Sequence, residues 1–183
     1  MGNCYALDTT VWSEDAVVGF EASERIFDYF VSDNPDGRFL EYRKPHAIAD
    51  KGYTKANIIK TDYIRAVPSV PILSTRAIEV FGDRLRDDAD IEDCIVRCGD
   101  EEFLFHILRI NRRIEGLIDK SRTEYRKRRD YEIPWFLVYN PNIQEPFMLA
   151  KDAERITYWV ASEAFRELAL KNKLKISFRA LRV

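Results

Sequence analysis

Two apolar runs separated by a short turn constrain the fold of this chain most strongly. The runs are Ile91–Cys98 and Glu102–Ile110, and Gly99-Asp100 divides them. A Gly-Asp turn between two such runs predicts an antiparallel hairpin. At its centre the second run is apolar on both alternating faces, which is typical of an interior strand. We therefore expect the second run to be an interior strand of a sheet.

Three segments combine apolar residues at helical spacing with a serine that can act as N-cap. They are Ser23–Val31, the run from Ser74 to about Leu85, and Glu163 to about Lys171 behind Ser162. The turn chemistry of residues 33–37 predicts an early end to the first helix. We also expect a charged, solvated helix within Arg112–Arg129, because Ile114, Leu117 and Ile118 share a helical spacing.

Further strands are expected at both ends of the chain and in its middle. The candidates are Cys4–Trp12, a buried strand at Ile133–Tyr139, a shorter one beginning at Phe147–Leu149, and Ile176–Leu181. Arg38–Val70 is irregular and predicts short strands joined by long loops. Strands and helices without a regular alternation favour an α+β fold, with a mostly antiparallel sheet and a few short helices packed against it. With 183 residues, we expect a single domain over residues 1–183.

Composition and cysteine usage predict a soluble protein of the cytoplasm. The chain is 46% hydrophobic and 33% charged, a balance typical of globular domains. Its three cysteines are too few and too irregularly spaced for a disulfide framework, and the N-terminus lacks a secretory pattern. No window approaches the roughly 20 apolar residues of a membrane helix, so we expect no membrane association.

The sequence contains no recognisable catalytic or metal-binding pattern. Neither His46 nor His106 has a zinc spacing to another imidazole or thiolate, so we expect no bound metal. His106 is interpreted as a hydrogen-bonded structural residue, and His46 as a loop residue. Cys94 and Cys98 are interpreted as small buried apolar side chains. Glycine patterns for phosphate or dinucleotide binding are absent from the sequence, so no cofactor is expected.

Charge is distributed unevenly although the formal net charge is only −2. Residues 79–102 contain ten acidic and three basic side chains, whereas residues 109–129 contain nine basic and three acidic ones. Within the acidic run we predict a mobile, partner-binding loop that could enter a basic cleft. Its members are Asp87, Asp88, Asp90, Glu92 and Asp93. The alternative is that these residues only keep an exposed loop solvated.

The basic run allows two further interpretations. Lys120–Arg129, with Tyr125 and Tyr131 nearby, could bind nucleic acid, because cations hold phosphates and aromatic rings stack on bases. The acidic isoelectric point of about 5.8 and the interruptions at Glu124 and Asp130 favour a solvated surface instead. Asp119 with Glu124-Tyr125-Arg126 forms a loose metal-nuclease pattern, which is of a kind that arises often by chance.

Two stretches resemble a known bacterial family. Lys60-Thr61-Asp62-Tyr63-Ile64 followed by Pro71-Ile72-Leu73-Ser74-Thr75-Arg76-Ala77 is the first, and Arg155–Val160 with Ser162-Glu163-Ala164-Phe165 and the final strand is the second. The pattern is similar to a family first catalogued as a domain of unknown function and assigned to immunity proteins of polymorphic toxin systems. The resemblance covers residues 60–183, and residues 1–59 add little to it.

The resemblance implies a protein that binds and neutralises a cognate toxin. The family has no catalytic residues that could be assigned to positions of this sequence. It does not identify the toxin or the binding surface. The alternatives are an enzyme or toxin-effector domain with an unrecognised active site, and a nucleic-acid-binding module that uses residues 120–129.

Overall fold

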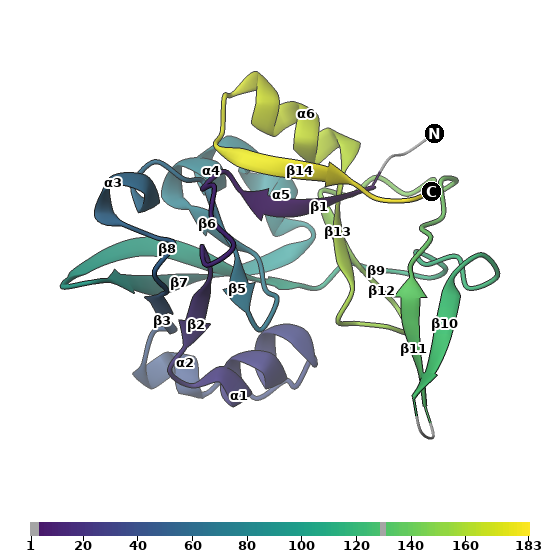
Figure 1. Ribbon diagram of the computed structural model, residues 1–183, viewed down its shortest axis with the longest axis horizontal. Coiled ribbons are helices and arrows are strands. Elements are labelled where there is room, and N and C mark those ends of the chain that lie inside the picture. The colour runs from purple at the N-terminus through teal and green to yellow at the C-terminus, as the bar shows by residue number, and fades with distance from the viewer. Residues whose placement is uncertain (1–3, 129–130) are drawn as a thin grey trace.

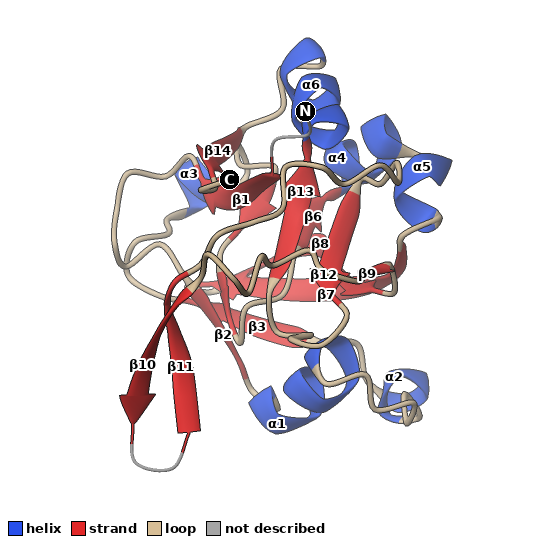
Figure 2. Ribbon diagram, turned by 90° about the vertical axis from the view of Figure 1, so that its right-hand side faces the viewer, coloured by secondary structure: helices blue, strands red, loops and turns tan. Residues whose placement is uncertain are grey.

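The strands form two sheets and a separate two-stranded hairpin (Figure 1). The computed structural model describes residues 4–128 and 131–183. Most strand pairs are antiparallel, and the helices lie around the sheets, so the α+β class expected from the sequence is confirmed (Figure 2). Among the described helices, none is long and apolar enough to cross a membrane.

The larger sheet has seven strands in the order β4-β6-β8-β7-β3-β2-β5. These strands are β2 (Val18–Phe20), β3 (His46–Ala49), β4 (Tyr63–Ile64), β5 (Ala66–Val67), β6 (Ile72–Ser74), β7 (Ala89–Cys98) and β8 (Glu101–Ile110). The expected hairpin is β7–β8, in which Cys98 pairs with Glu101 and Gly99 takes the left-handed φ of 63°. Strand β8 is interior, as predicted. His46, expected in a loop, instead begins β3.

The second sheet has five strands in the order β14-β1-β13-β12-β9. These strands are β1 (Cys4–Thr9), β9 (Arg113–Ile114), β12 (Leu149–Asp152), β13 (Trp159–Ser162) and β14 (Ile176–Ala180). Residues from both sheets share one core, which includes Leu7 and Leu149 of the five-stranded sheet and Leu73 and Leu108 of the seven-stranded sheet. Segments from the first 59 residues lie in both sheets, as β1 in one and as β2 and β3 in the other.

The helices are short, and two of them begin as the sequence predicts. They are α1 (Ser23–Ile26) with the π-helical turn η1 (Phe27–Val31), α2 (Phe39–Tyr42), α3 (Lys55–Ile58), α4 (Thr75–Phe81), α5 (Asp83–Arg86) and α6 (Glu163–Lys171). The Ser74 hydroxyl accepts a hydrogen bond from the Ala77 amide at 3.1 Å, and the Ser162 hydroxyl accepts one from the Phe165 amide at 3.2 Å. Both serines are therefore N-caps.

Other helix predictions were wrong in detail. Ser23 is the first residue of α1 and not its cap, a position that Ala22 occupies. The helix expected to run to Leu85 divides into α4 and α5 at Gly82, whose φ of 55° is outside the helical range. The irregular region 38–70 contains the helical turns α2 and α3 besides its short strands.

The basic region 112–129 is not helical. Its first part forms β9 and turns, and its last part forms β10 (Glu124–Arg128), which pairs with β11 (Tyr131–Phe136) in a protruding two-stranded hairpin (Figure 1). Gly116 interrupts the apparent helical stripe with a φ of 66°. The strand expected to be buried at Ile133–Tyr139 is consequently only partly buried, since β11 pairs with β10 alone.

The buried carboxylate of Asp62 links the start of α4 to the segment before β14. This carboxylate accepts a hydrogen bond from the Ser74 hydroxyl at 2.5 Å and one from the Lys175 amide at 2.7 Å. Arg76 lies 3.3 Å from the same carboxylate and donates to the Asn172 carbonyl at 2.8 Å. These contacts form a junction between α4 and the segment that leads into β14.

Candidate functional site

The five acidic residues proposed for partner binding do not form a loop. Asp87 follows α5 as its C-cap, and Asp90 lies within β7. Asp88 is buried, and its carboxylate accepts backbone hydrogen bonds from Met148 at 2.5 Å and Leu149 at 3.3 Å. Burial raises the pKa of Asp88. The expectation of a mobile acidic loop was therefore wrong, because a helix end and a strand hold these residues in place.

The remaining acidic residues point to two sides of the sheet. Side chains alternate along a strand, so Asp90 and Glu92 lie on one face of β7 and Asp93 on the other. Asp93 accepts a hydrogen bond from Lys44 at 2.6 Å, which lowers its pKa, and lies 3.3 Å from His106 Nδ1. Asp87 and Asp90 are exposed and stay available for a partner.

His106 makes two polar contacts, and the cysteines differ in their burial. The other ring nitrogen of His106 lies 3.0 Å from the Thr75 hydroxyl, so this histidine is hydrogen-bonded as predicted. Within residues 4–128 and 131–183 there is no group of three or more His, Cys, Asp or Glu placed to hold a metal ion. Cys94 is fully buried, whereas Cys98 on the same strand is partly exposed.

Burial of the cysteines predicts their reactivity. Desolvation raises the pKa of Cys4 to about 11 and that of Cys94 to about 12, so both thiols stay protonated and covered at neutral pH. We expect a thiol reagent to label only Cys98 in the native protein and all three cysteines after denaturation. Mass spectrometry of labelled peptides measures this, with Cys98→Ser as the control that removes native labelling. Rapid native labelling of Cys94 would contradict its placement in the core.

In the basic tract, residues 120–129, some of the positive side chains that the structure describes are paired with carboxylates and others are not. Lys120 pairs with Glu154, and Arg122 pairs with Asp119 at 2.6 Å. Hydrogen bonds from Ser121 and Arg122 lower the pKa of Asp119 to about 2, so this carboxylate is already satisfied by its own turn. Further along, Lys127 is exposed on β10, while Arg129 lies outside the described residues.

On the hairpin, basic and aromatic side chains interleave. The guanidinium of Arg126 lies 3.3 Å from the ring centroid of Trp135, a cation–π contact across the two strands. Trp135 nevertheless keeps 51% of its surface exposed, and the adjacent Phe136 keeps 49%. Large aromatic rings that are half exposed side by side are unusual on a surface with no partner. Together they form an exposed aromatic patch at the base of the hairpin.

A hollow of about 720 Å³ opens beside these two aromatic residues. Strands β1, β11, β13 and β14 and the segment around β5 all contribute to its lining. Trp159 is fixed there, because its indole N–H donates to the Ser69 carbonyl at 3.2 Å. The residues that give the hollow its chemical character are aromatic or basic: Arg65, Trp135, Phe136, Trp159, Arg179 and Arg182.

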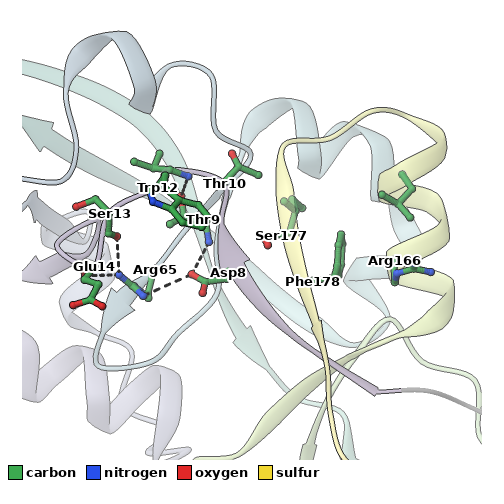
Figure 3. Close-up of a pocket in the computed structure, with 13 residues that line it drawn as sticks. Asp8, Thr9, Thr10, Trp12, Ser13, Glu14, Arg65, Arg166, Ser177 and Phe178 are labelled. Atoms are coloured by element: carbon green, nitrogen blue, oxygen red, sulfur yellow. Dashed lines mark hydrogen bonds and ion pairs between the residues drawn. The ribbon is translucent and has the colours of Figure 1, made fainter.

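A second hollow, of about 780 Å³, lies at the other end of β14 (Figure 3). It shares Asp8 and Arg65 with the first. Arg65 donates to the Glu14 carbonyl at 2.5 Å and lies 3.8 Å from the Asp8 carboxylate, so it fastens the loop after β1 to the sheet. On that loop the Trp12 side chain is fully exposed. The two hollows therefore form one continuous face.

We call this face the β14 surface and define it by residues that the two hollows contribute. They are Asp8, Trp12, Arg65, Trp135, Phe136, Arg179 and Arg182. In the part of the chain that the structure describes, the side chains of Arg179 and Arg182 have no ion-pair partner. The surface therefore combines exposed aromatic rings with uncompensated positive charge.

Sequence reasoning did not identify this surface. It assigned Trp135 and Phe136 to a buried strand and Trp12 to the opening strand. The one available signal was the interleaving of basic and aromatic residues between Lys120 and Tyr131, which it attributed to a solvated helix. No protein-family model matches the chain, and no curated protein sequence is significantly similar to it.

Proposed function

We propose that this chain is an immunity protein that binds a cognate bacterial toxin through the β14 surface. The observation that carries the proposal is the exposure of Trp135 and Phe136 at the edge of a hollow that also holds Arg179 and Arg182. Tryptophan, tyrosine and arginine are the side chains most enriched among the residues that dominate protein–protein binding energy. The sequence resemblance over residues 60–183 prompted the same proposal, and no protein-family model matches the chain.

The shape of the surface also suits a protein partner. Two adjoining hollows of about 720 and 780 Å³ give a concave, extended face. Their lining is anchored by contacts such as Arg65 with Asp8 and Trp159 with Ser69, which fix the site before binding. A preformed surface lowers the entropy cost of association. The mode of neutralisation that fits is steric, with the toxin covered by this face.

Replacing Trp135 should weaken the complex strongly. The probe is a candidate toxin domain taken from the genes adjacent to that of this chain, titrated by calorimetry. We expect Trp135→Ala to raise the Kd by roughly 30-fold or more, the equivalent of losing a residue worth about 2 kcal/mol. The matched control is Tyr42→Ala, an aromatic residue that is exposed outside the β14 surface and should leave the Kd unchanged. Equal affinities for both variants would remove the β14 surface from the interface.

The exposed acidic residues remain a second proposed contact, directed at a basic part of the toxin. The test reverses the charge of these residues. Because Asp88 is buried and accepts hydrogen bonds from two amides, the charge reversal is confined to Asp87→Lys with Asp90→Lys. We expect slower association and a weaker salt dependence, since exposed charges act mainly on the association rate. Association kinetics at two ionic strengths measure this. Unchanged association rates at both ionic strengths would mean that Asp87 and Asp90 only keep the surface solvated.

Nucleic-acid binding is the alternative that one observation favours, the Arg126 and Trp135 pair on a basic hairpin. Single-stranded nucleic acid binds to such combinations of stacking rings and cations. An unstructured oligonucleotide is the test. Tight binding that falls steeply with salt and is lost in Trp135→Ala, without any binding of the toxin domain, would favour this function over the immunity role.

A further inference from the structure

Strand β14 is an edge strand whose outer side is open. It ends the order β14-β1-β13-β12-β9 and pairs with β1 alone. The Leu181 amide donates to the Cys4 carbonyl at 2.9 Å, and the same register pairs Arg179 with Ala6. Backbone groups alternate in direction along an antiparallel strand, so those of Phe178 and Ala180 point away from β1.

These outward backbone groups have no hydrogen-bond partner among the described residues. Beyond the end of β14, the Tyr139 amide donates to the Arg182 carbonyl at 2.8 Å, so the unpaired outer edge ends before Arg182. Helix α6 packs over β1 and β13, and its Arg166 and Leu170 line the hollow beside the first half of β14. The two hollows flank β14 along its length, and Ser177 and Ala180 are exposed.

We infer that an extended segment of the toxin, bearing Asp or Glu side chains, adds to the five-stranded sheet as a strand beside β14. This inference rests on the proposed function and specifies how the partner binds. An added strand forms hydrogen bonds with main-chain groups of β14 that otherwise bind water. Pockets that accept its side chains then provide specificity. The pockets here are the two hollows.

The positive charge on and beside β14 favours an acidic segment as the added strand. Lys175, Arg179 and Arg182 are exposed on and beside β14, and their side chains have no ion-pair partner within the described residues. A second copy of this chain paired through β14 would bring these cations together, and their repulsion would oppose the pairing. Charged side chains on edge strands are one way in which natural proteins avoid self-association. Carboxylates on an incoming strand would instead neutralise them.

The test uses amide exchange of the ¹⁵N-labelled chain, measured by NMR with and without the same candidate toxin domain. In the free protein the Phe178 and Ala180 amides should exchange faster than those of Arg179 and Leu181, which point toward β1. On binding, the first pair should slow by roughly tenfold or more, while the second pair changes little. The two pairs lie in one strand, so each controls for the other.

Each outcome of this experiment separates the inference from the proposed function. Binding without added protection of Phe178 and Ala180 would overturn strand addition and leave the immunity role intact. If the toxin domain does not bind at all, the proposed function fails, and strand addition fails with it. Protection that rises with the concentration of the chain alone would assign the edge to a second copy and overturn the acidic segment as occupant.

A backbone variant provides the complementary measurement. Ala180→Pro removes one outward donor without removing a hydrogen bond to β1, whereas Ala180→Ser changes the side chain and keeps the donor. We expect the first to weaken the toxin complex by roughly tenfold and the second to leave it nearly unchanged. Equal affinities in the two variants, with spectra that show an intact fold, would count against pairing at this position.

Discussion

Phe165→Ala should lower the free energy of unfolding by about 3–5 kcal/mol, the range for removing a fully buried phenylalanine. The side chain is 0% exposed, and its ring stacks on Phe81 with the centroids 4.0 Å apart. It also contacts Phe178 edge-on at 6.2 Å. Because the surrounding core draws on both sheets, the cavity left by the substitution cannot close through the movement of one helix alone.

Urea unfolding followed by circular dichroism measures this loss, and thermal unfolding should show a fall in Tm of roughly 6–20 °C. The control lies on the same helix, since Leu170 is 50% exposed and Leu170→Ala should change the stability by no more than about 0.5 kcal/mol. A Tm that hardly moves in Phe165→Ala would mean that α6 does not cover this core.

Local chemistry explains why parts of this fold could be predicted from the sequence. Ser74 and Ser162 act as N-caps through hydrogen bonds that span three residues, and Gly99 supplies the left-handed conformation of a two-residue turn. Such features depend on neighbours in the chain, so the pattern of residues determines them. The hairpin β7–β8 and the final helix α6 were therefore predicted close to their observed bounds.

Region 112–129 shows where the same reasoning fails. Ile114, Leu117 and Ile118 have a helical spacing, yet they reach one core cluster from a strand, a turn and an isolated bridge. What buries them is contact with β12, β13 and Tyr139, which are distant in the sequence. Spacing alone cannot distinguish a helical stripe from separate residues that long-range contacts bury together.

The candidate site was missed for a related reason. Trp135 and Phe136 belong to an apolar run, and such a run predicts burial, but β11 pairs only with β10 and leaves these rings half exposed. The open edge of β14 likewise depends on strand order, which no local pattern reveals. An apolar residue exposed against its sequence pattern is itself a sign of a binding surface, since function is what commonly maintains such exceptions.

Asp33→Asn should destabilise the protein by about 3 kcal/mol, because it leaves the ammonium of Lys151 buried without a counter-charge. The Lys151 side chain is only 3% exposed on β12, and it pairs with Asp33, which also binds Arg113. Asp33 has a φ of 60°, a conformation that asparagine tolerates equally well. The substitution therefore removes the charge while it keeps the size and backbone preference of the side chain.

The pH dependence of this loss identifies its cause. Burial lowers the pKa of Lys151 from the ordinary value of 10.5, and the hydrogen bond and charge of Asp33 oppose that effect. Without Asp33 the folded-state pKa should fall further, so the unfolded chain binds the extra proton and stability rises with pH up to the unfolded value. We expect the deficit of Asp33→Asn, measured by urea unfolding, to shrink as the pH approaches 10.5.

A double variant tests whether Asp33 and Lys151 act as a pair. Lys151→Met removes the buried charge and keeps a side chain of similar length, while Asp33 retains Arg113 as a partner. In the background of Lys151→Met, the Asp33→Asn substitution should cost clearly less than it costs alone, because no buried ammonium remains. If the two losses add without interaction, and the deficit of Asp33→Asn is the same at every pH, the buried pair does not hold the loop at Asp33 against β12.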